Sequence, residues 1–385
     1  MSGTGTGGSD ESRLVCAVAP HFELPGEFLG AARIGSGHIH ETFVARCKTS
    51  GSPARFVVQR LNGYVFRDLP ALMENWVRVT SHQRARLEER GVPDAERRCL
   101  TPVPARAGGF HHVDSEGGFW RAFPYLEGTR SVNEVENPEH ARRASRAFGD
   151  FALQLSDLGG PPLAETIPRF HDLAHRAAAL ERAAREDVRG RAAGVRDEVE
   201  RAAEAVAWTQ DALAAAGFAE CPSRVVHNDC KINNVMFDEK SGEALCVIDL
   251  DTVMHGTLLN DFGQLVRTST CDSPEDELRL DTMRVDPALY RAVVGGYLAG
   301  AGPLLTPLEL DLLHLAGPMI TLEDAVRFLT DHLEGDPYYR IHREGHNRDR
   351  ARAQLQLFAL LQRDRDAARA LVAEVAGSGQ GGRLA

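Results

Sequence analysis

The fold of this chain is decided by the stretch Val225-Val226-His227-Asn228-Asp229-Cys230-Lys231-Ile232-Asn233-Asn234-Val235. The first two residues of this stretch are the end of an apolar strand. A His, an Asp, a Lys and Asn residues follow directly after that strand. A second apolar run soon afterwards delivers Asp249 and Asp251. Phosphoryl transfer uses such a set, a carboxylate beside the attacking hydroxyl and an Asn with a second carboxylate to hold magnesium. Asp229 and Asn234 also have the spacing of the kinase catalytic loop. The joint pattern predicts a phosphoryl-transfer site.

Each polar residue of these two segments has an expected role. Asp229 is expected to be the base that accepts the proton of the substrate hydroxyl. Lys231 would neutralise charge on the transferring phosphoryl group. Asn234 and Asp249 would bind magnesium, because a hard cation prefers oxygen ligands. Asp251 is either a second magnesium ligand or a turn residue, and the sequence leaves both open.

The sequence Asp261-Phe262-Gly263 looks like the metal-binding motif of protein kinases, but we interpret it differently. A turn-like segment precedes it, whereas the metal-binding Asp should end a buried strand, as Asp249 does. Asp261 is therefore expected to be structural and to cap a helix that starts at Gln264. The chain from Asp249 to that helix is too short for an activation loop, so protein substrates are not expected. His227 is expected to brace the catalytic loop by hydrogen bonds.

Composition limits the class of protein. At 385 residues the chain exceeds one ordinary core, so two lobes are expected. The net charge of −11 argues against a nucleic-acid partner. The absence of a long apolar run argues against a transmembrane helix and a membrane partner. The seven cysteines are scattered and odd in number, which favours a reducing cytoplasm over a disulfide framework or a structural zinc site. A monomer or homodimer is expected.

Sequence patterns divide the chain into segments. Residues 1–20 are expected to be a disordered leader, and residues 376–385 a flexible tail. Residues 21–127 alternate short strands with turns and include a helix capped by Asp68, which predicts a small α+β nucleotide-binding lobe. Residues 128–375 are expected to form a mostly helical catalytic and acceptor-binding lobe. Its expected helices cover residues 138–158, 173–216 (one or two helices), 286–300, 307–332 and 346–375.

Two features of the small lobe bear on nucleotide binding. The turn Gly35-Ser36-Gly37 lies between two expected strands, where glycine would let backbone amides approach phosphates. A tight hairpin is the alternative for this turn. The third strand places Gln59 where kinases have a Lys, with Arg60 beside it on the opposite face. Either the register differs by one residue or Gln59 itself hydrogen-bonds to phosphate. Glu74 on the following helix is the expected partner of a cation there.

Segments spread over roughly residues 25–370 carry a resemblance to a known family. Besides the catalytic loop, they are Gly35–Ile39, Gln59–Asn62, Leu72–Asn75, Phe123–Gly128, Glu165–Asp172, Val247–Met254, Arg327–Asp331 and His342–Asn347. Through them the chain resembles the aminoglycoside phosphotransferase/choline kinase superfamily, and within it the N-acetylhexosamine 1-kinase group. The resemblance implies an α+β, bilobal protein-kinase-like fold. A small N-terminal β-sheet lobe would carry one main helix, and a larger C-terminal lobe would be mostly helical.

The resemblance also implies an activity. ATP and magnesium would be the cofactors, and the anomeric hydroxyl of an N-acetylated hexose would be phosphorylated to give a sugar 1-phosphate. Asp229 would be the base. Pro124, Tyr125 and Leu126 would lie in the segment beside the adenine. Gln59 at the Lys position would be a habit of the group and no sign of a dead enzyme.

The acceptor pocket is expected in the helical lobe, and two other functions stay open. One is an aminoglycoside or other antibiotic O-phosphotransferase of the same mechanism. The other is a nucleotide-binding pseudokinase, which only the missing lysine supports. The candidate acceptor residues, each of which could equally be a structural polar residue, are His171, Asp172, Arg267, Arg327 and Tyr339.

Overall fold

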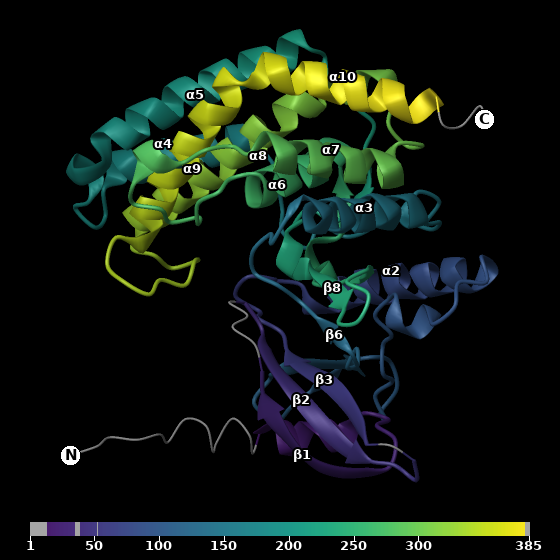
Figure 1. The fold of residues 1–385 in the computed structure, drawn as a ribbon. Helices are drawn as coiled ribbons and strands as arrows, with labels where there is room; N and C mark the ends of the chain where they lie inside the picture. Colours follow the sequence, from purple (N-terminus) through teal and green to yellow (C-terminus); the bar gives the residue numbers. More distant parts are fainter. Residues whose placement is uncertain (1–13, 35–38, 52, 382–385) are drawn as a thin grey trace. The chain divides into compact units, whose positions relative to one another are not determined.

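The computed structural model describes residues 14–34, 39–51 and 53–381, and the chain separates into two compact units, Met1–Thr129 and Arg130–Ala385. We call these unit 1 and unit 2. Unit 1 carries the largest sheet, and unit 2 carries most of the helices (Figure 1). Within the described ranges, no helix is both long and apolar enough to cross a lipid bilayer.

Unit 1 is built around an antiparallel sheet with the strand order β1-β2-β3-β5-β4. Alternate side chains of a strand point to the same face, so Phe43, Ala45 and Cys47 of β2 share one buried face. Val58 of β3 and Trp120 of β5 belong to the same core. The strands are β1 (Glu27–Arg33), β2 (Glu41–Lys48), β3 (Ala54–Arg60), β4 (His112–Val113) and β5 (Phe119–Pro124).

The disordered leader predicted over residues 1–20 extends too far along the chain. Residues 14–18 are helical, and the 3-10 helix η1 (Ala19–His21) continues them. Val15, Val18 and Ala19 are buried in the core of unit 1. Their spacing places them on one side of a helix, which the Gly- and Ser-rich composition of the preceding residues obscured.

The main helix of unit 1 is α2 (Leu69–Glu89), and it begins as predicted. The Asp68 side chain accepts a hydrogen bond from the backbone N–H of Ala71 at 3.0 Å, and Pro70 stands in the first turn. This cap satisfies one of the backbone donors that a helix start leaves without a partner.

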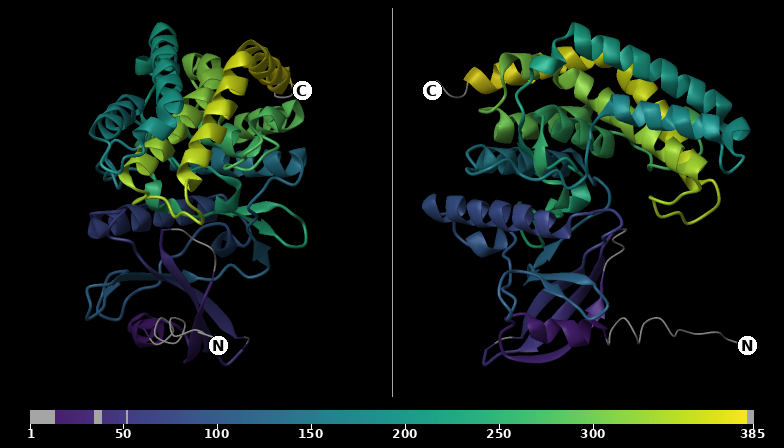
Figure 2. Two further views of the ribbon diagram at one scale, coloured as in Figure 1. Left: turned by 90° about the vertical axis from the view of Figure 1, so that its left-hand side faces the viewer. Right: turned by 180° about the vertical axis from the view of Figure 1, so that it is seen from behind.

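Unit 2 is mostly helical, and its longest helix, α8, is buried on nearly every side. Helix α8 packs against α4, α5, α6, α9 and α10, which makes it the centre of this unit. Figure 2 shows the closely packed helices of unit 2 in two further views. The helices are α3 (Pro138–Leu155), α4 (Leu173–Glu186), α5 (Arg196–Ala215), α6 (Leu258–Ser269), α7 (Pro287–Ala301), α8 (Pro307–Glu334), α9 (His346–Arg363) and α10 (Arg365–Gly381).

Short strands in unit 2 support the catalytic segments. Strand β7 (Arg224–Val226) pairs with β10 (Met254–Gly256), and β8 (Val235–Asp238) pairs with β9 (Ala244–Val247). Both pairs are antiparallel. The remaining short elements are β6 (Thr129–Arg130), at the boundary of the units, and the 3-10 helices η2 (Ala95–Arg97), η3 (Ala192–Val195), η4 (Phe218–Glu220), η5 (Ile232–Asn234), η6 (Leu250–Thr252) and η7 (Leu280–Thr282).

The C-terminal region corrects two expectations. The helix expected over residues 346–375 is two helices, because α9 ends at Arg363 and α10 begins after Asp364. The turn lets α10 pack on α7 and α8. Helix α10 also continues to Gly381, so the predicted tail starts too early.

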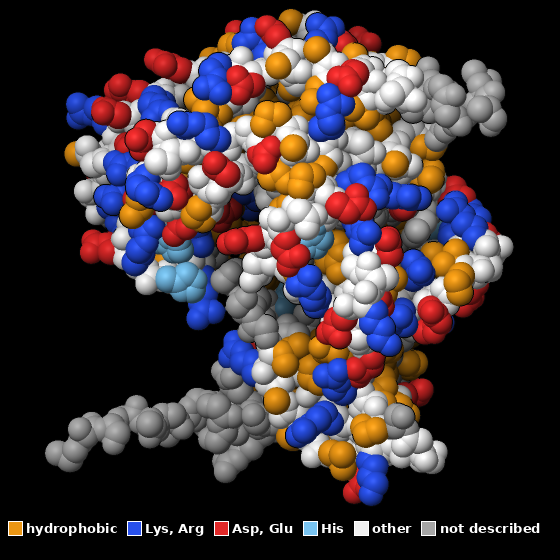
Figure 3. All heavy atoms as spheres, in the orientation of Figure 1, with side chains coloured by type: hydrophobic (Ala, Val, Ile, Leu, Met, Phe, Trp, Pro, Cys, Tyr) orange, Lys and Arg blue, Asp and Glu red, His pale blue; other side chains and the backbone are white. Residues whose placement is uncertain are grey.

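Many surface charges of unit 2 lie in pairs. Arg291 of α7 meets Glu374 of α10 at 2.9 Å, and Arg369 of α10 meets Asp311 of α8 at 2.8 Å. Basic and acidic side chains are interspersed over the face of unit 2 seen in Figure 3. Exposed pairs of this kind contribute little stability each.

Candidate active site

The catalytic loop, residues 227–234, lies in unit 2 between β7 and β8. Strand β7 ends at Val226, as predicted, and its pairing with β10 fixes where the loop begins. At the other end, the N–H of Ile248 donates to the carbonyl of Asn234 at 2.9 Å. This contact brings Asp249, the next residue, close to Asn234. Strand pairing therefore assembles the two predicted metal-binding segments.

Asp229 and Lys231 form an ion pair in this loop, with Lys231 Nζ 2.8 Å from Asp229 Oδ2. Burial alone would raise the pKa of Asp229, but the charge and hydrogen bond of Lys231, together with other positive groups such as Arg267, outweigh it and the pKa is lowered. Burial alone would lower the pKa of Lys231, but the charges of Asp229 and Asp249 raise it. Asp229 is therefore a carboxylate at neutral pH and can accept a proton.

Asn234 directs its amide NH2 group at Asp229. Nδ2 donates to the Asp229 carbonyl at 3.0 Å and to the carboxylate Oδ2 at 3.2 Å. The amide oxygen of Asn234 is the atom of this side chain that could bind a cation, and Asp249 directly follows Ile248, whose N–H donates to the Asn234 backbone carbonyl. An amide oxygen beside a carboxylate is a donor set that fits a hard cation such as Mg²⁺.

Asp251, for which the sequence left two roles open, is buried in η6. Its carbonyl accepts a hydrogen bond from Thr166 Oγ1 at 2.6 Å. This contact ties the turn to the segment before α4, so the backbone of Asp251 has a structural role. In the described part of the chain, no group of three or more His, Cys, Asp or Glu side chains is arranged to hold a metal.

His227 braces the loop, as predicted. Its Nε2 lies 3.0 Å from the Ile248 carbonyl, and its Nδ1 accepts from the backbone N–H of Asp229 at 3.2 Å. These partners place the ring proton on Nε2. Phe148 and Phe151 of α3 meet the imidazole in T-shaped contacts, with ring centroids 5.1 and 5.6 Å away. The ring thus joins Ile248, the residue after β9, to the loop and to α3.

Asp261 is structural, but the predicted cap is wrong. Helix α6 begins at Leu258, so Asp261 already stands in its first turn. The carboxylate accepts from the backbone N–H groups of His227 and Asn228 at 3.0 and 2.7 Å. It therefore supports the catalytic loop and does not cap its own helix. The path from Asp249 to the helix is even shorter than expected.

Four of the five candidate acceptor residues gather around α8. Arg267 of α6 and Arg327 of α8 both pair with Asp324, at 2.8 and 2.9 Å. His171 pairs with Glu323, also on α8, at 3.0 Å. The guanidinium of Arg327 lies 5.5 Å from the ring centre of Tyr339.

The remaining contacts of the candidates are local. Asp172 is the N-cap of α4 and accepts from the backbone N–H of His175 at 2.8 Å. The hydroxyl of Tyr339 is buried without a hydrogen-bond partner among the described residues.

Unit 1 contains a buried cation, Arg121, that the sequence pattern did not reveal. Gln59 pairs in register with Arg121 of β5, and Arg121 Nε donates to Gln59 Oε1 at 3.0 Å. The Arg121 side chain is buried and lies over the ring of Trp76, 4.9 Å from its centre. Arg60 points elsewhere and lies 3.5 Å from Glu41. A strand pairing is the only signal that could have revealed Arg121.

The other predicted nucleotide residues lie in different places. Glu74 is exposed on α2. Pro124 ends β5, and the Tyr125 ring lies under the Arg55 guanidinium at 4.0 Å. Leu126 is buried. The turn Gly35-Ser36-Gly37 lies outside the described residues.

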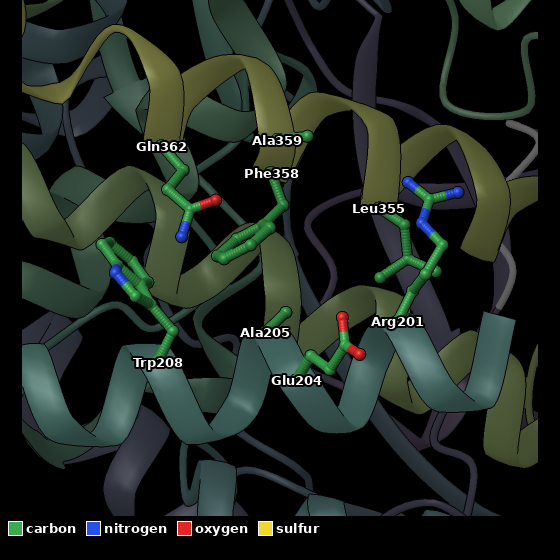
Figure 4. Close-up of a pocket in the computed structure, with 8 residues that line it drawn as sticks. All are labelled: Arg201, Glu204, Ala205, Trp208, Leu355, Phe358, Ala359 and Gln362. Carbon is green, nitrogen blue, oxygen red and sulfur yellow. The ribbon is translucent and has the colours of Figure 1, made fainter. Parts of the chain in front are cut away.

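A hollow of about 320 Å³ lies between α5 and α9 of unit 2. Trp208 and Phe358 form its apolar wall, and Arg201 and Glu204 stand at its edge (Figure 4). None of the site residues predicted from the sequence lines it.

Comparison with known proteins defines the class. A carboxylate paired with a lysine, followed along the chain by an Asn and a second Asp, is the set of side chains that phosphoryl transfer uses. Residues 31–295, more than half of the chain, match the phosphotransferase enzyme family (APH). The chain belongs to this family.

Solved structures support the same fold. The microcompartment-associated aminopropanol kinase aligns with a TM-score of 0.56 and 15% identity, covering 92% of this chain and 98% of its own. An aminoglycoside phosphotransferase from Alicyclobacillus acidocaldarius has a TM-score of 0.56 and 14% identity, covering 94% and 96%. A choline/ethanolamine kinase family protein from Mesorhizobium loti has a TM-score of 0.54 and 17% identity, covering 94% and 98%. The predicted α+β, protein-kinase-like fold is confirmed.

Proposed function

We propose that this phosphotransferase is an ATP- and magnesium-dependent kinase that phosphorylates a sugar, most specifically the anomeric hydroxyl of an N-acetylhexosamine. The observation that carries the kinase part is the ionised Asp229, paired with Lys231 at 2.8 Å and hydrogen-bonded by the Asn234 amide nitrogen at 3.2 Å. The resemblance of the sequence motifs to N-acetylhexosamine 1-kinases supports the acceptor.

The residues of the loop divide the chemistry. The carboxylate of Asp229 accepts the proton of the acceptor hydroxyl as that oxygen attacks the γ-phosphorus of ATP, whose bond to the β,γ-bridging oxygen breaks to release ADP. The ammonium of Lys231 offsets negative charge on the transferring group. Asn234 and Asp249 would hold magnesium, with Asp251 as a second carboxylate, and the ion would neutralise phosphate charge when bound. His227 and Asp261 keep the loop in place.

The nucleotide contacts of the proposal belong to unit 1. Arg121 supplies the positive charge for phosphate that the missing lysine would otherwise supply, and Gln59 orients the guanidinium through its 3.0 Å hydrogen bond. The backbone of Gly35-Ser36-Gly37 and the segment of Tyr125 complete the contacts with phosphate and adenine. A pseudokinase is disfavoured, because the loss of the lysine on β3 is compensated by a buried arginine on β5.

An uncharged sugar fits the site better than a polycationic antibiotic. The charges of Lys231 and Arg267 both act on Asp229 and help to lower its pKa. Lys231 already pairs with Asp229 at 2.8 Å, so a cationic acceptor would have to compete with its ammonium for the carboxylate. Antibiotic phosphorylation is the second candidate and is separated from the first by the following experiment.

The test is a panel of free hexoses, N-acetylhexosamines and aminoglycosides, each incubated with ATP and MgCl₂ and followed by phosphorus NMR. We expect turnover of an N-acetylhexosamine and a doublet from an anomeric phosphate. Phosphate on a ring hydroxyl of an aminoglycoside would make the antibiotic alternative correct. No turnover of any acceptor would contradict the kinase proposal.

The variant Asp229→Asn tests the base. The amide keeps the shape of the side chain but cannot accept the proton, so we expect kcat to fall by about 10²–10⁴-fold. The matched control is Asp211→Asn on the exposed face of α5, which should leave kcat unchanged. Equal activity of the two variants would remove Asp229 from the mechanism.

A further inference from the structure

His171 makes two buried polar contacts that join distant parts of unit 2. Its Nδ1 lies 3.0 Å from Glu323 Oε1 of α8, and its Nε2 lies 2.9 Å from the carbonyl of Asn228. The two side chains are only 5% and 2% exposed. His171 is therefore held between the central helix and the catalytic loop.

The two contacts determine the charge of the ring. A carboxylate and a carbonyl both accept hydrogen bonds and have no proton to donate. Both ring nitrogens must therefore donate, and only the imidazolium carries a proton on each nitrogen. A neutral ring would leave one lone pair facing an oxygen at about 3 Å in a buried place. His171 is a cation in this arrangement.

Asn228, which receives one of these hydrogen bonds, directly precedes the proposed base. Its φ of 65° lies in the left-handed region, which a non-glycine residue adopts only when its surroundings hold it there. Its N–H donates to Asp261, and its Nδ2 donates to the carbonyl of Thr252 at 3.0 Å. The contact of His171 with the carbonyl fixes the peptide group that leads into Asp229.

We propose that His171 and Glu323 form a positioning pair, in which the imidazolium held by Glu323 fixes the carbonyl of Asn228 and thereby the carboxylate of Asp229. The proposal rests on the proposed kinase function, since Asp229 is the base only there. Neither residue touches the reacting atoms.

The surrounding charges agree with this state. Burial alone would lower the pKa of His171, but the charge of Glu323 and the hydrogen bonds to Glu323 and Asn228 outweigh it, so the pKa is raised. Arg327, one turn further along α8, opposes the shift, and Arg176 of α4 also acts on Glu323. Because the pKa is raised on folding, the contribution to stability is complete below about pH 6.5 and is lost as the pH rises through the folded value.

The first measurement needs no activity. Long-range proton–nitrogen NMR of the histidine-labelled protein at pH 7.5 should show both ring nitrogens of His171 protonated, with His171→Gln identifying the signal. In Glu323→Gln the ring should be neutral at the same pH. A neutral His171 in the unaltered protein would overturn the proposal.

The second measurement concerns position. In Glu323→Gln we expect faster backbone hydrogen exchange over residues 225–235 and, at pH 8, a kcat about 10–100-fold lower, because a small displacement of the base is costly. The loss should shrink below pH 6, where His171 regains its proton. His171→Gln should lose kcat at every pH, and KM for ATP should stay constant in both variants.

The matched control is Glu198→Gln. It breaks an ion pair elsewhere in unit 2, between Glu198 of α5 and Arg352 of α9, which are 2.5 Å apart. It should change neither the exchange of residues 225–235 nor the pH profile of kcat. If Glu323→Gln behaves like this control in both readouts, the positioning role is wrong even though the enzyme is a kinase. If the unaltered protein phosphorylates no acceptor, the NMR and exchange results still decide the pair, and only the proposed function fails.

Discussion

Arg121 shows how much one residue can change the interpretation of a site. The sequence pattern predicts a phosphate-binding cation on the third strand, where Gln59 stands. The structure places a buried arginine on the neighbouring strand, hydrogen-bonded to that glutamine at 3.0 Å. The two residues are 62 positions apart, so only the pairing of β3 with β5 brings them together.

The variant Arg121→Met tests this role. Methionine keeps much of the apolar contact with Trp76 but removes the charge, so we expect KM for ATP to rise about 10–100-fold, since a hydrogen bond to a charged group contributes about 1.5–3 kcal/mol. The control is Arg46→Met on β2, whose side chain is exposed. An unchanged KM for ATP in Arg121→Met would show that this guanidinium does not bind phosphate.

At the scale of elements, α3 and α7 approach each other through glycines. A Cβ added to Gly296 of α7 would lie 2.2 Å from the carbonyl oxygen of Arg142 in α3. A Cβ on Gly149 of α3 would lie 2.7 Å from the backbone N of Ala301. The two helices can lie this close only because these positions lack side chains. Helix α3 carries the aromatic contacts of His227, so this packing also supports the catalytic loop.

Adjacent glycines of α7 make a matched test. Gly296→Ala should lower the free energy of unfolding by about 1–3 kcal/mol, because the methyl group would push α3 away. Gly295→Ala meets nothing within 4 Å and should leave stability unchanged or raise it by about 1 kcal/mol, since alanine favours a helix. Urea denaturation of both variants measures the difference. Equal stabilities would show that the close approach of α3 and α7 is not required.

At the scale of the whole molecule, each unit has a core of its own. Phe43 belongs to a buried cluster whose members all come from unit 1. Leu329 belongs to a cluster whose members all come from unit 2. The members of each cluster pack among themselves within one unit.

Core truncations should therefore act on one unit at a time. Phe43→Ala should destabilise unit 1 by about 3–5 kcal/mol, and Leu329→Ala should destabilise unit 2 by about 2–5 kcal/mol. Peptide-resolved hydrogen exchange should show the loss of protection confined to the unit that carries the change. Loss of protection over the whole chain in either variant would show that the two units unfold as one.

Features that depend on neighbours in the chain were predicted well. The Asp68 cap of α2, the end of β7 and the bracing role of His227 follow from local spacing, and the structure has all three. Errors arose where local patterns carry no information about packing. The Gly-rich composition of the first residues led to a prediction of disorder that included Val15 and Val18, although these side chains are buried. Asp261 was predicted to cap its own helix, although its hydrogen-bond partners lie on the catalytic loop.

The sequence by itself determined the fold class, and its order Asp229, Asn234, Asp249 predicted the catalytic segments, because these groups stand at strand ends at short spacing. Only the tertiary structure decided what supports them. Glu323 lies 152 residues from His171, and the carbonyl that His171 contacts is 57 residues away. Such partners are chosen by helix packing and strand register, which depend on the whole chain. Their hydrogen bonds and charges then determine the protonation of His171 and the position of Asp229.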